Sequence, residues 1–177
     1  MPDTHVVQQA LSLHEKYLLT PVINAAGSFT PLGVSRSPEP VRQAVAAALG
    51  EFFVIDELQE AVSRTVARQT GAEAAAVVHC VAAGITVAVA AAMAGRRPES
   101  VAALPDAQGL AHRVVLPAGH AVDYGHPILT DIRLAGASPV LAGTPKSCSV
   151  DDLHAALAHE KTAALLLVSS RLTSGKP

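Results

Sequence analysis

A long stretch without charge constrains the fold more than any other feature of the sequence. No Asp, Glu, Lys or Arg occurs between residues 74 and 95. The stretch has two parts, a short run containing Val77 and Val78 and an alanine-rich segment closed by Gly95. Because β-branched residues favour strands and alanine favours helices, we expect a strand over 74–78 and a helix over 82–94. Both elements should be buried, since nothing in them is charged.

The same stretch is long enough to cross a membrane, but its composition argues against that interpretation. It contains His79 and Gly84 and no leucine, and alanine contributes little transfer free energy. The net charge of −2 gives no electrostatic basis for binding a membrane surface or nucleic acid. We therefore expect neither membrane insertion nor direct nucleic-acid binding.

Apolar runs and helical patterns alternate through the rest of the chain. We expect strands over 113–116, 139–142 and 163–168, and a helix over 121–134 that Pro127 bends or delays. Ser149 and Asp152 have the spacing of a capping box at the start of a further helix. Such alternation predicts crossover units, and so an α/β fold with three αβα layers and a mainly parallel sheet.

The N-terminal part of the chain shows helical spacing without strands. Apolar periodicity predicts helices over 6–17, after Ser37-Pro38, and from Asp56 to Gly71. Ser37 is expected to cap the second of these helices, and Gln59 to complete a capping box at the start of the third. We therefore expect residues 1–72 to form a helical arm and lead-in segment, and residues 73–177 to form the α/β domain.

The turn after the first expected strand is the predicted ligand site. Ligands of parallel sheets bind beyond the carboxyl ends of the strands, and N–H groups at the start of the next helix attract phosphate. This turn runs from His79 through Cys80, Val81 and Ala82 to Gly84. His79 is either a hydrogen-bond donor to phosphate or a histidine at a strand end without a ligand. Cys80 is either a reactive thiol at a helix start or a small buried residue.

Three segments, in order, resemble one family of enzymes. They are VINAAG at 22–27, the stretch from DELQ at 56–59 to TGAEA at 70–74, and Gly119-His120 followed by YGH at 124–126. Through them the chain is similar, over about residues 17–168, to pyridoxal-phosphate (PLP) enzymes of fold type I. The similar branch is that of selenocysteine synthase and D-glucosaminate-6-phosphate ammonia-lyase. The resemblance implies an incomplete PLP-transferase-like large domain.

The resemblance also implies pyridoxal 5'-phosphate as the cofactor and residues that bind it. His79, Cys80, Val81 and Ala82 would hold its phosphate, and the ring of His120 would stack on its pyridine. The hydroxyl and the glycine that the family has in this turn are absent here. Cys80 restores a Cβ where glycine would let the backbone approach the phosphate.

Other polar side chains carry weaker signals. Arg36 and Ser28 lie where the family's active site begins, and would bind a substrate carboxylate or phosphate. Arg36 can equally be a solvated side chain on a loop. Surface positions beside a turn are the alternative for His120 and His126; we take His120 as functional and His126 as a surface residue. The spacing of the histidines does not predict a metal site, and no catalytic residue is assigned.

In the family, the Schiff-base lysine and the aspartate that binds the pyridine nitrogen would follow the last residue of this sequence. Lys176 is expected in a terminal loop and does not match that lysine. We therefore expect an N-terminal fragment, inactive alone, of a PLP-dependent lyase that removes ammonia or a β-substituent from an amino acid or amino sugar acid. The alternatives are an L-seryl-tRNA(Sec) selenium transferase-like protein and a non-catalytic remnant or interaction module.

A fragment of this kind would lack some neighbours of its own strands. The first strand would then be separated from the others, with open edges. We therefore expect the chain alone to be poorly soluble, partly folded or stabilised by association into a homo-oligomer. The expected partner is a small amino acid-like substrate. The two cysteines do not form a disulfide framework, which indicates a cytoplasmic protein.

Overall fold

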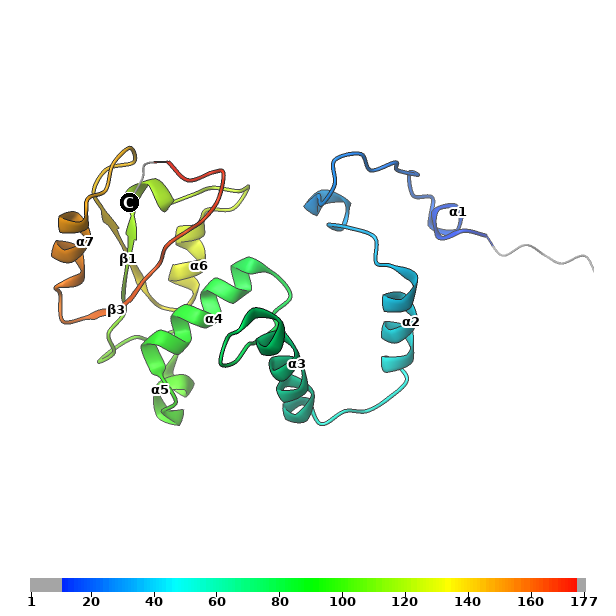
Figure 1. The fold of residues 1–177 in the computed structure, drawn as a ribbon, viewed down its shortest axis with the longest axis horizontal. Helices are drawn as coiled ribbons and strands as arrows, with labels where there is room; N and C mark the ends of the chain where they lie inside the picture. Colours follow the sequence, from blue (N-terminus) through cyan, green and yellow to red (C-terminus); the bar gives the residue numbers. More distant parts are fainter. Residues whose placement is uncertain (1–10, 175–177) are drawn as a thin grey trace, which may run out of the picture. The chain divides into compact units, whose positions relative to one another are not determined.

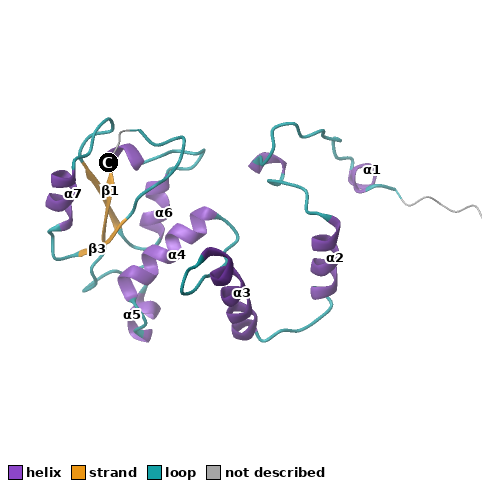
Figure 2. Cartoon of the chain, in the orientation of Figure 1, coloured by secondary structure: helices purple, strands orange, loops and turns teal. Residues whose placement is uncertain are grey.

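The computed structural model describes residues 11–174 (Figures 1 and 2). The chain divides into two compact units, Met1–Val54 and Ile55–Pro177. Each unit is described by itself. The domain boundary expected after residue 72 stays a prediction.

The first unit holds short helices joined by loops, and all its described residues are exposed. Its elements are α1 (Leu13–Tyr17), the short 3₁₀ helix η1 (Thr30–Leu32) and α2 (Glu39–Ala48). Ser12 and Glu15 form a capping box at the start of α1. The beginning of the helix predicted over 6–17 lies outside the described residues.

The cap predicted for the second helix is wrong. Pro38, and not Ser37, is the N-cap of α2, and no side chain accepts a hydrogen bond there. Proline is tolerated at this position because the first N–H groups of a helix have no intrahelical partner.

The second unit contains a parallel sheet. Its helices are α3 (Ile55–Thr70), α4 (Val81–Ala94), α5 (Pro98–Ala103), α6 (Ile128–Leu134), α7 (Val150–Leu157) and the short 3₁₀ helix η2 (Ala118–His120). Its strands are β1 (Arg113–Pro117), β2 (Ser138–Ala142) and β3 (Thr162–Leu165), in the order β2–β1–β3. Both pairings are parallel, as the alternating pattern predicted. The third strand ends earlier than expected.

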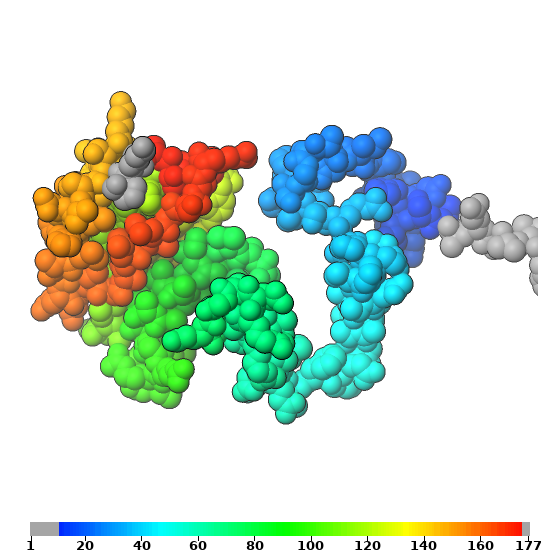
Figure 3. Space-filling model, viewed as in Figure 1, coloured from blue at the N-terminus to red at the C-terminus, as the bar shows by residue number. Residues whose placement is uncertain are grey.

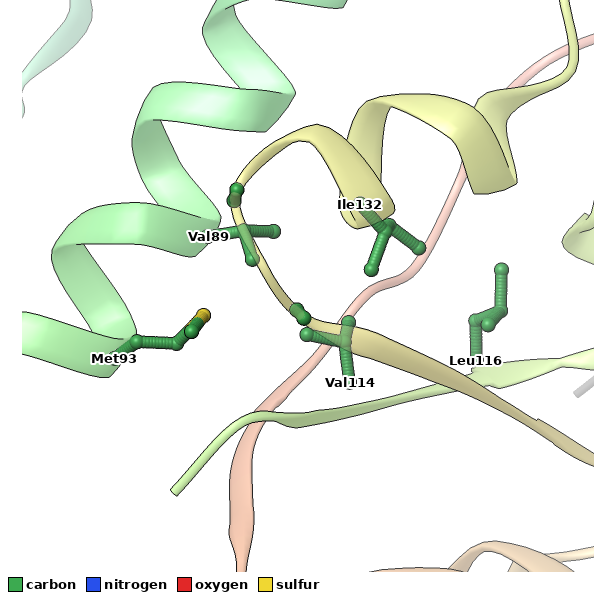
Figure 4. Close-up of a cluster of buried hydrophobic side chains, with 7 residues drawn as sticks. Val89, Met93, Val114, Leu116 and Ile132 are labelled. Atoms are coloured by element: carbon green, nitrogen blue, oxygen red, sulfur yellow. The ribbon is translucent and has the colours of Figure 1, made fainter. Parts of the chain in front are cut away.

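Helices cover both faces of this sheet. On one face, Val114 and Leu116 of β1 pack with Val89 and Met93 of α4 and with Ile132 of α6 (Figure 4). On the other face, Val115 packs with Ala142, Cys148 and the apolar side of α7. Successive side chains of a strand point to opposite faces, so the central strand β1 supplies both clusters. The α/β class with helices on either side of a parallel sheet is confirmed.

The strand predicted over 74–78 is wrong. These residues form no ladder with the described strands, and the side chains of Val77 and Val78 are exposed. The N–H of Ala75 instead donates a hydrogen bond to Oγ of Ser63 in α3, 3.0 Å away. A strand requires a neighbour to pair its N–H and C=O groups.

The helix predicted over 121–134 is shorter than expected. Pro127 is the N-cap of α6, which begins at Ile128, and residues 121–126 form a loop. The delay attributed to Pro127 is confirmed. The predicted capping box is also confirmed, since Ser149 Oγ accepts from the N–H of Asp152 and the Asp152 carboxylate accepts from the N–H of Ser149. Within residues 11–174, no helix has both the length and the apolar character needed to cross a membrane.

Candidate ligand site at the start of helix α4

A cavity of about 510 Å³ lies at the N-terminal end of α4. Its walls come from the turn before α4, the first turns of α4, the loop 124–126 and α6. A volume of this size is typical of a small-molecule site. His79, Cys80 and Ala82, three of the four residues predicted to hold a phosphate, line this cavity together.

The fourth predicted residue lies elsewhere. Val81 lines a second, apolar cavity of about 340 Å³ formed by α4, β1, β3 and Leu166. Val81 is not among the residues that line the cavity at the start of α4. Only the main chain of Val81 can contribute to the predicted phosphate site.

The start of α4 has a sulfur cap. Cys80 is the N-cap, and its Sγ accepts a hydrogen bond from the N–H of Ala83 at 3.5 Å. The N–H of Gly84 donates to the carbonyl of Cys80 at 3.0 Å. Among the described residues, the N–H groups of Val81 and Ala82 have no hydrogen-bond acceptor. Two free donors at the positive end of a helix dipole suit the oxygens of an anion.

Asp131 is the most buried charged residue of the cavity wall, and only 1% of it is exposed. Its Oδ1 lies 2.6 Å from Nε2 of His126, and its Oδ2 accepts a hydrogen bond of 2.6 Å from the hydroxyl of Tyr124. Thr86 Oγ1 donates to the main-chain carbonyl of Asp131 at 3.0 Å, which ties α4 to α6. Both carboxylate oxygens of Asp131 are therefore paired, as burial of a charge requires.

Tyr124 is 45% exposed as a whole, although its hydroxyl is bonded to this buried carboxylate. Partial burial raises the pKa of Tyr124 to about 12, and the hydrogen bond to Asp131 and its negative charge act in the same direction. The phenol therefore keeps its proton at neutral pH and serves as a donor.

His120, predicted to stack on a pyridine ring, is held in the second unit by a different set of contacts. It is buried at the end of η2, directly after β1, and its Nδ1 accepts a hydrogen bond of 3.1 Å from the N–H of Val168. The segment after β3, coloured red in Figures 1 and 3, supplies this donor. His120 is not among the residues that line the cavity at α4. Its stacking role stays a prediction.

Arg36 and Ser28 belong to the first unit, where both are exposed. Before Ser28 the side chain of Asn24 closes a turn, because its Nδ2 donates to the carbonyl of Gly27 at 2.7 Å and its Oδ1 accepts from the N–H of Ala26 at 2.9 Å. This turn accounts for part of the VINAAG motif in physical terms. Substrate binding by Arg36 and Ser28 stays a prediction.

Sequence reasoning missed the cluster of Tyr124, His126 and Asp131. The sequence predicts a surface position for His126 and gives no role to Asp131. The available signal was Pro127, because a helix that begins directly after this proline places Asp131 in its first turn, close to the loop that carries the other two side chains.

Comparisons with known proteins agree with the motifs. No protein-family model matches the chain. The D-glucosaminate-6-phosphate ammonia lyase of Salmonella typhimurium (strain 14028s / SGSC 2262) is 43% identical over 159 residues, which are 90% of this chain and 43% of that protein. The 5'-C-glycyluridine monooxygenase-decarboxylase of a Streptomyces species is 35% identical over 159 residues, which are 86% of this chain and 38% of that protein.

The fold agrees as well. A solved structure of D-glucosaminate-6-phosphate ammonia-lyase matches with a TM-score of 0.88 and 42% sequence identity, over 92% of this chain and 44% of that one. The chain thus spans less than half the length of the relatives that it matches. Sequence and fold together confirm the resemblance that the motifs indicated: over most of its length, this chain is similar to D-glucosaminate-6-phosphate ammonia-lyase.

Proposed function

We propose that this chain is the cofactor-phosphate-binding part of a PLP-dependent lyase that removes ammonia from an amino sugar acid. The observation that carries the proposal is the match to D-glucosaminate-6-phosphate ammonia-lyase, at 43% sequence identity and a TM-score of 0.88. The proposed substrate class is therefore a phosphorylated amino sugar acid such as D-glucosaminate 6-phosphate.

The donors at the start of α4 fit a phosphate group. The N–H groups of Val81 and Ala82 have no other acceptor among the described residues, and His79 lines the adjoining cavity. The Sγ of Cys80 occupies the N–H of Ala83, so phosphate would bind to the two preceding donors. Bound PLP would supply the electron sink on which such an elimination depends.

The proposed function gives each predicted residue a defined task. The main chain of Val81 and Ala82 binds the anion, and His79 adds a donor from the side chain. His120 would orient the flat ring of the cofactor and keep water from one of its faces. Arg36 and Ser28 are proposed to bind an anionic group of the substrate.

A chimaera tests the whole proposal. The segment of the Salmonella lyase that aligns with this chain is replaced by this chain, and ammonia release from D-glucosaminate 6-phosphate is measured with PLP added. We expect activity, and we expect the chimaera with His120→Ala to lose most of it. The matched control is His154→Ala on the exposed side of α7, which should leave activity unchanged. A chimaera with a cooperative melting transition but no ammonia release would contradict the proposal.

Binding by the 177-residue chain itself gives a second test. Amide NMR signals of Val81 and Ala82 should shift on addition of PLP, and to a lesser extent on addition of inorganic phosphate. His79→Ala should weaken PLP binding about tenfold, which corresponds to one charge-assisted hydrogen bond. Unchanged amide signals at saturating PLP would count against phosphate binding at this turn.

A further inference from the structure

The buried carboxylate of Asp131 fixes which nitrogen of His126 carries the proton. A carboxylate only accepts hydrogen bonds, and Nε2 of His126 lies 2.6 Å from Oδ1. The neutral ring must therefore carry its hydrogen on Nε2 and keep a lone pair on Nδ1. Among residues 11–174, no donor is bonded to this Nδ1.

The ring is also held in place from a second side. Tyr124 donates to the other oxygen of Asp131, and the rings of Tyr124 and His126 lie 5.8 Å apart at an angle of 58°. The side chain of His126 is 41% exposed and lines the cavity at the start of α4. The remaining titratable groups near this cluster are His79 and Cys80, on the cavity wall, and Asp123, in the loop before Tyr124.

We propose that His126 is an acid–base residue of the cavity at α4, and that Asp131 and Tyr124 are its positioning residues. The inference rests on the proposed function for the identity of its ligand, a hydroxylated amino sugar acid. A hydroxyl of that ligand loses its proton to Nδ1, so one O–H bond breaks and one N–H bond forms. The ring becomes an imidazolium whose Nε2–H stays on Asp131, and return of the same proton restores the starting state.

A purely structural role would also account for the hydrogen bonds, because they fasten the loop 121–127 to α6. The two roles differ at Nδ1. A structural role does not require Nδ1 to bind a ligand or to gain a proton. An acid–base role requires that the lone pair of Nδ1 faces a ligand and takes up a proton from it.

The tautomer of His126 is the first measurement. Two-bond nitrogen–hydrogen NMR correlations on the 177-residue chain with isotope-labelled histidine distinguish the two neutral forms. The signals are assigned with His126→Gln. We expect the Nε2–H form in the free chain. The Nδ1–H form in the unsubstituted chain would overturn the inference.

Asp131→Asn should reverse the tautomer. Tyr124 continues to donate to the amide oxygen of the new side chain, so the amide NH₂ faces Nε2 of His126 and forces the hydrogen onto Nδ1. Adding Tyr124→Phe removes that constraint and should restore a mixture. If Asp131→Asn does not fold, the tautomer of His126 is measured in Tyr124→Phe alone. Because the carboxylate of Asp131 is still present in that variant, the hydrogen should stay on Nε2. A tautomer that Asp131→Asn leaves unchanged, or that Tyr124→Phe alone reverses, would overturn the positioning roles.

The ligand response is the second measurement. With PLP present, D-glucosaminate 6-phosphate should move the Nδ1 signal from the unprotonated towards the protonated position while Nε2–H is retained. The amides of Val81 and Ala82 report phosphate binding separately. If these amides shift and Nδ1 does not, the acid–base role is wrong and the proposed function stands. If the amides do not shift, the proposed function fails, and the inference fails with it.

Discussion

Val168 donates its N–H to Nδ1 of His120 across 3.1 Å, and so fastens the segment after β3 to the turn after β1. A second bond reinforces the first, because the N–H of Ser174 donates to the carbonyl of Gly119 at 2.9 Å. A Cβ on residue 119 would lie only 1.7 Å from the carbonyl oxygen of Ser174. This approach of two main-chain segments is therefore open only to glycine.

Gly119→Ala should destabilise the second unit. The methyl group must push away the main chain of Ser174, and we expect a loss of about 2 kcal/mol, as for overpacked sites in general. Urea unfolding followed by circular dichroism measures it. Gly50→Ala is the control, because a Cβ there meets only the carbonyl oxygen of Ala47 at an ordinary 3.4 Å. Equal stability of the two variants would contradict the close approach.

Ile132→Ala should have a larger effect than Leu134→Ala on the same helix. Ile132 is fully buried between β1 and α4, whereas Leu134 is mostly exposed. Truncation of a buried isoleucine leaves a cavity and costs about 3 kcal/mol, and truncation of an exposed leucine costs less than about 1 kcal/mol. Thermal melting of both variants checks the difference. A reversed order would mean that α6 presents another face to the sheet.

The raised pKa of Tyr124 should make the free energy of unfolding decrease at alkaline pH. Its pKa is raised from 10.0 to about 12 in the folded chain, first by burial and then by Asp131. Above a pH of about 10 the unfolded chain loses this proton while the folded chain keeps it, so unfolding becomes easier. The contribution is complete below that pH and declines as the pH rises through about 12.

The measurement is a tyrosinate absorbance titration. The chain has two tyrosines, so the difference between the unsubstituted chain and Tyr124→Phe isolates Tyr124. The midpoint should lie near 12 in the folded chain and should return towards 10.0 in denaturant. A midpoint near 10.0 in both conditions would mean that the hydroxyl does not bind Asp131 in solution.

The two thiols should react at different rates with a disulfide reagent. Cys80 is exposed at the start of α4, whereas Cys148 is buried against β1 and α7. Burial raises the pKa of the Cys148 thiol, and the nearby charge of Asp152 adds to the effect. Less thiolate and less access both slow its reaction.

Substitution assigns the fast and the slow phase of the reaction with the disulfide reagent to the two cysteines. Cys80→Ser should remove the fast phase and leave the slow one, and Cys148→Ser should do the reverse. Under the proposed function, PLP should protect Cys80 alone. A fast phase that survives Cys80→Ser would show that the core around Cys148 opens readily.

The sequence was sufficient to predict an element wherever residues within that element determine where it forms or begins. The charge-free run predicted α4, Ser149 and Asp152 predicted the start of α7, and Pro127 predicted the delay of α6. The strand prediction for residues 74–78 was wrong because a strand needs a neighbouring strand to pair with. The sequence of one segment does not show whether such a neighbour is present.

The site was less predictable for a similar reason. His79, Cys80 and Ala82 share a cavity because they are close in the sequence. The role of Asp131 was not predicted because it depends on burial of the carboxylate, and that burial depends on how α6 packs against the sheet. An aspartate in the first turn of a helix usually needs no explanation beyond the helix dipole.

The strand order β2–β1–β3 has a consequence for how the chain is made. α6 separates β1 from β2, and α7 separates β2 from β3, so neither pairing can close through a local hairpin. Synthesis delivers α4 before β1, which lets the helix shelter one side of that strand early. The other edge of β1 can pair only after residues 162–165 have been synthesised. Of the three strands, β1 is therefore made first but is fully paired only when the last strand is complete. Assembly of this sheet is for that reason expected to be slow compared with that of a helical bundle of equal length.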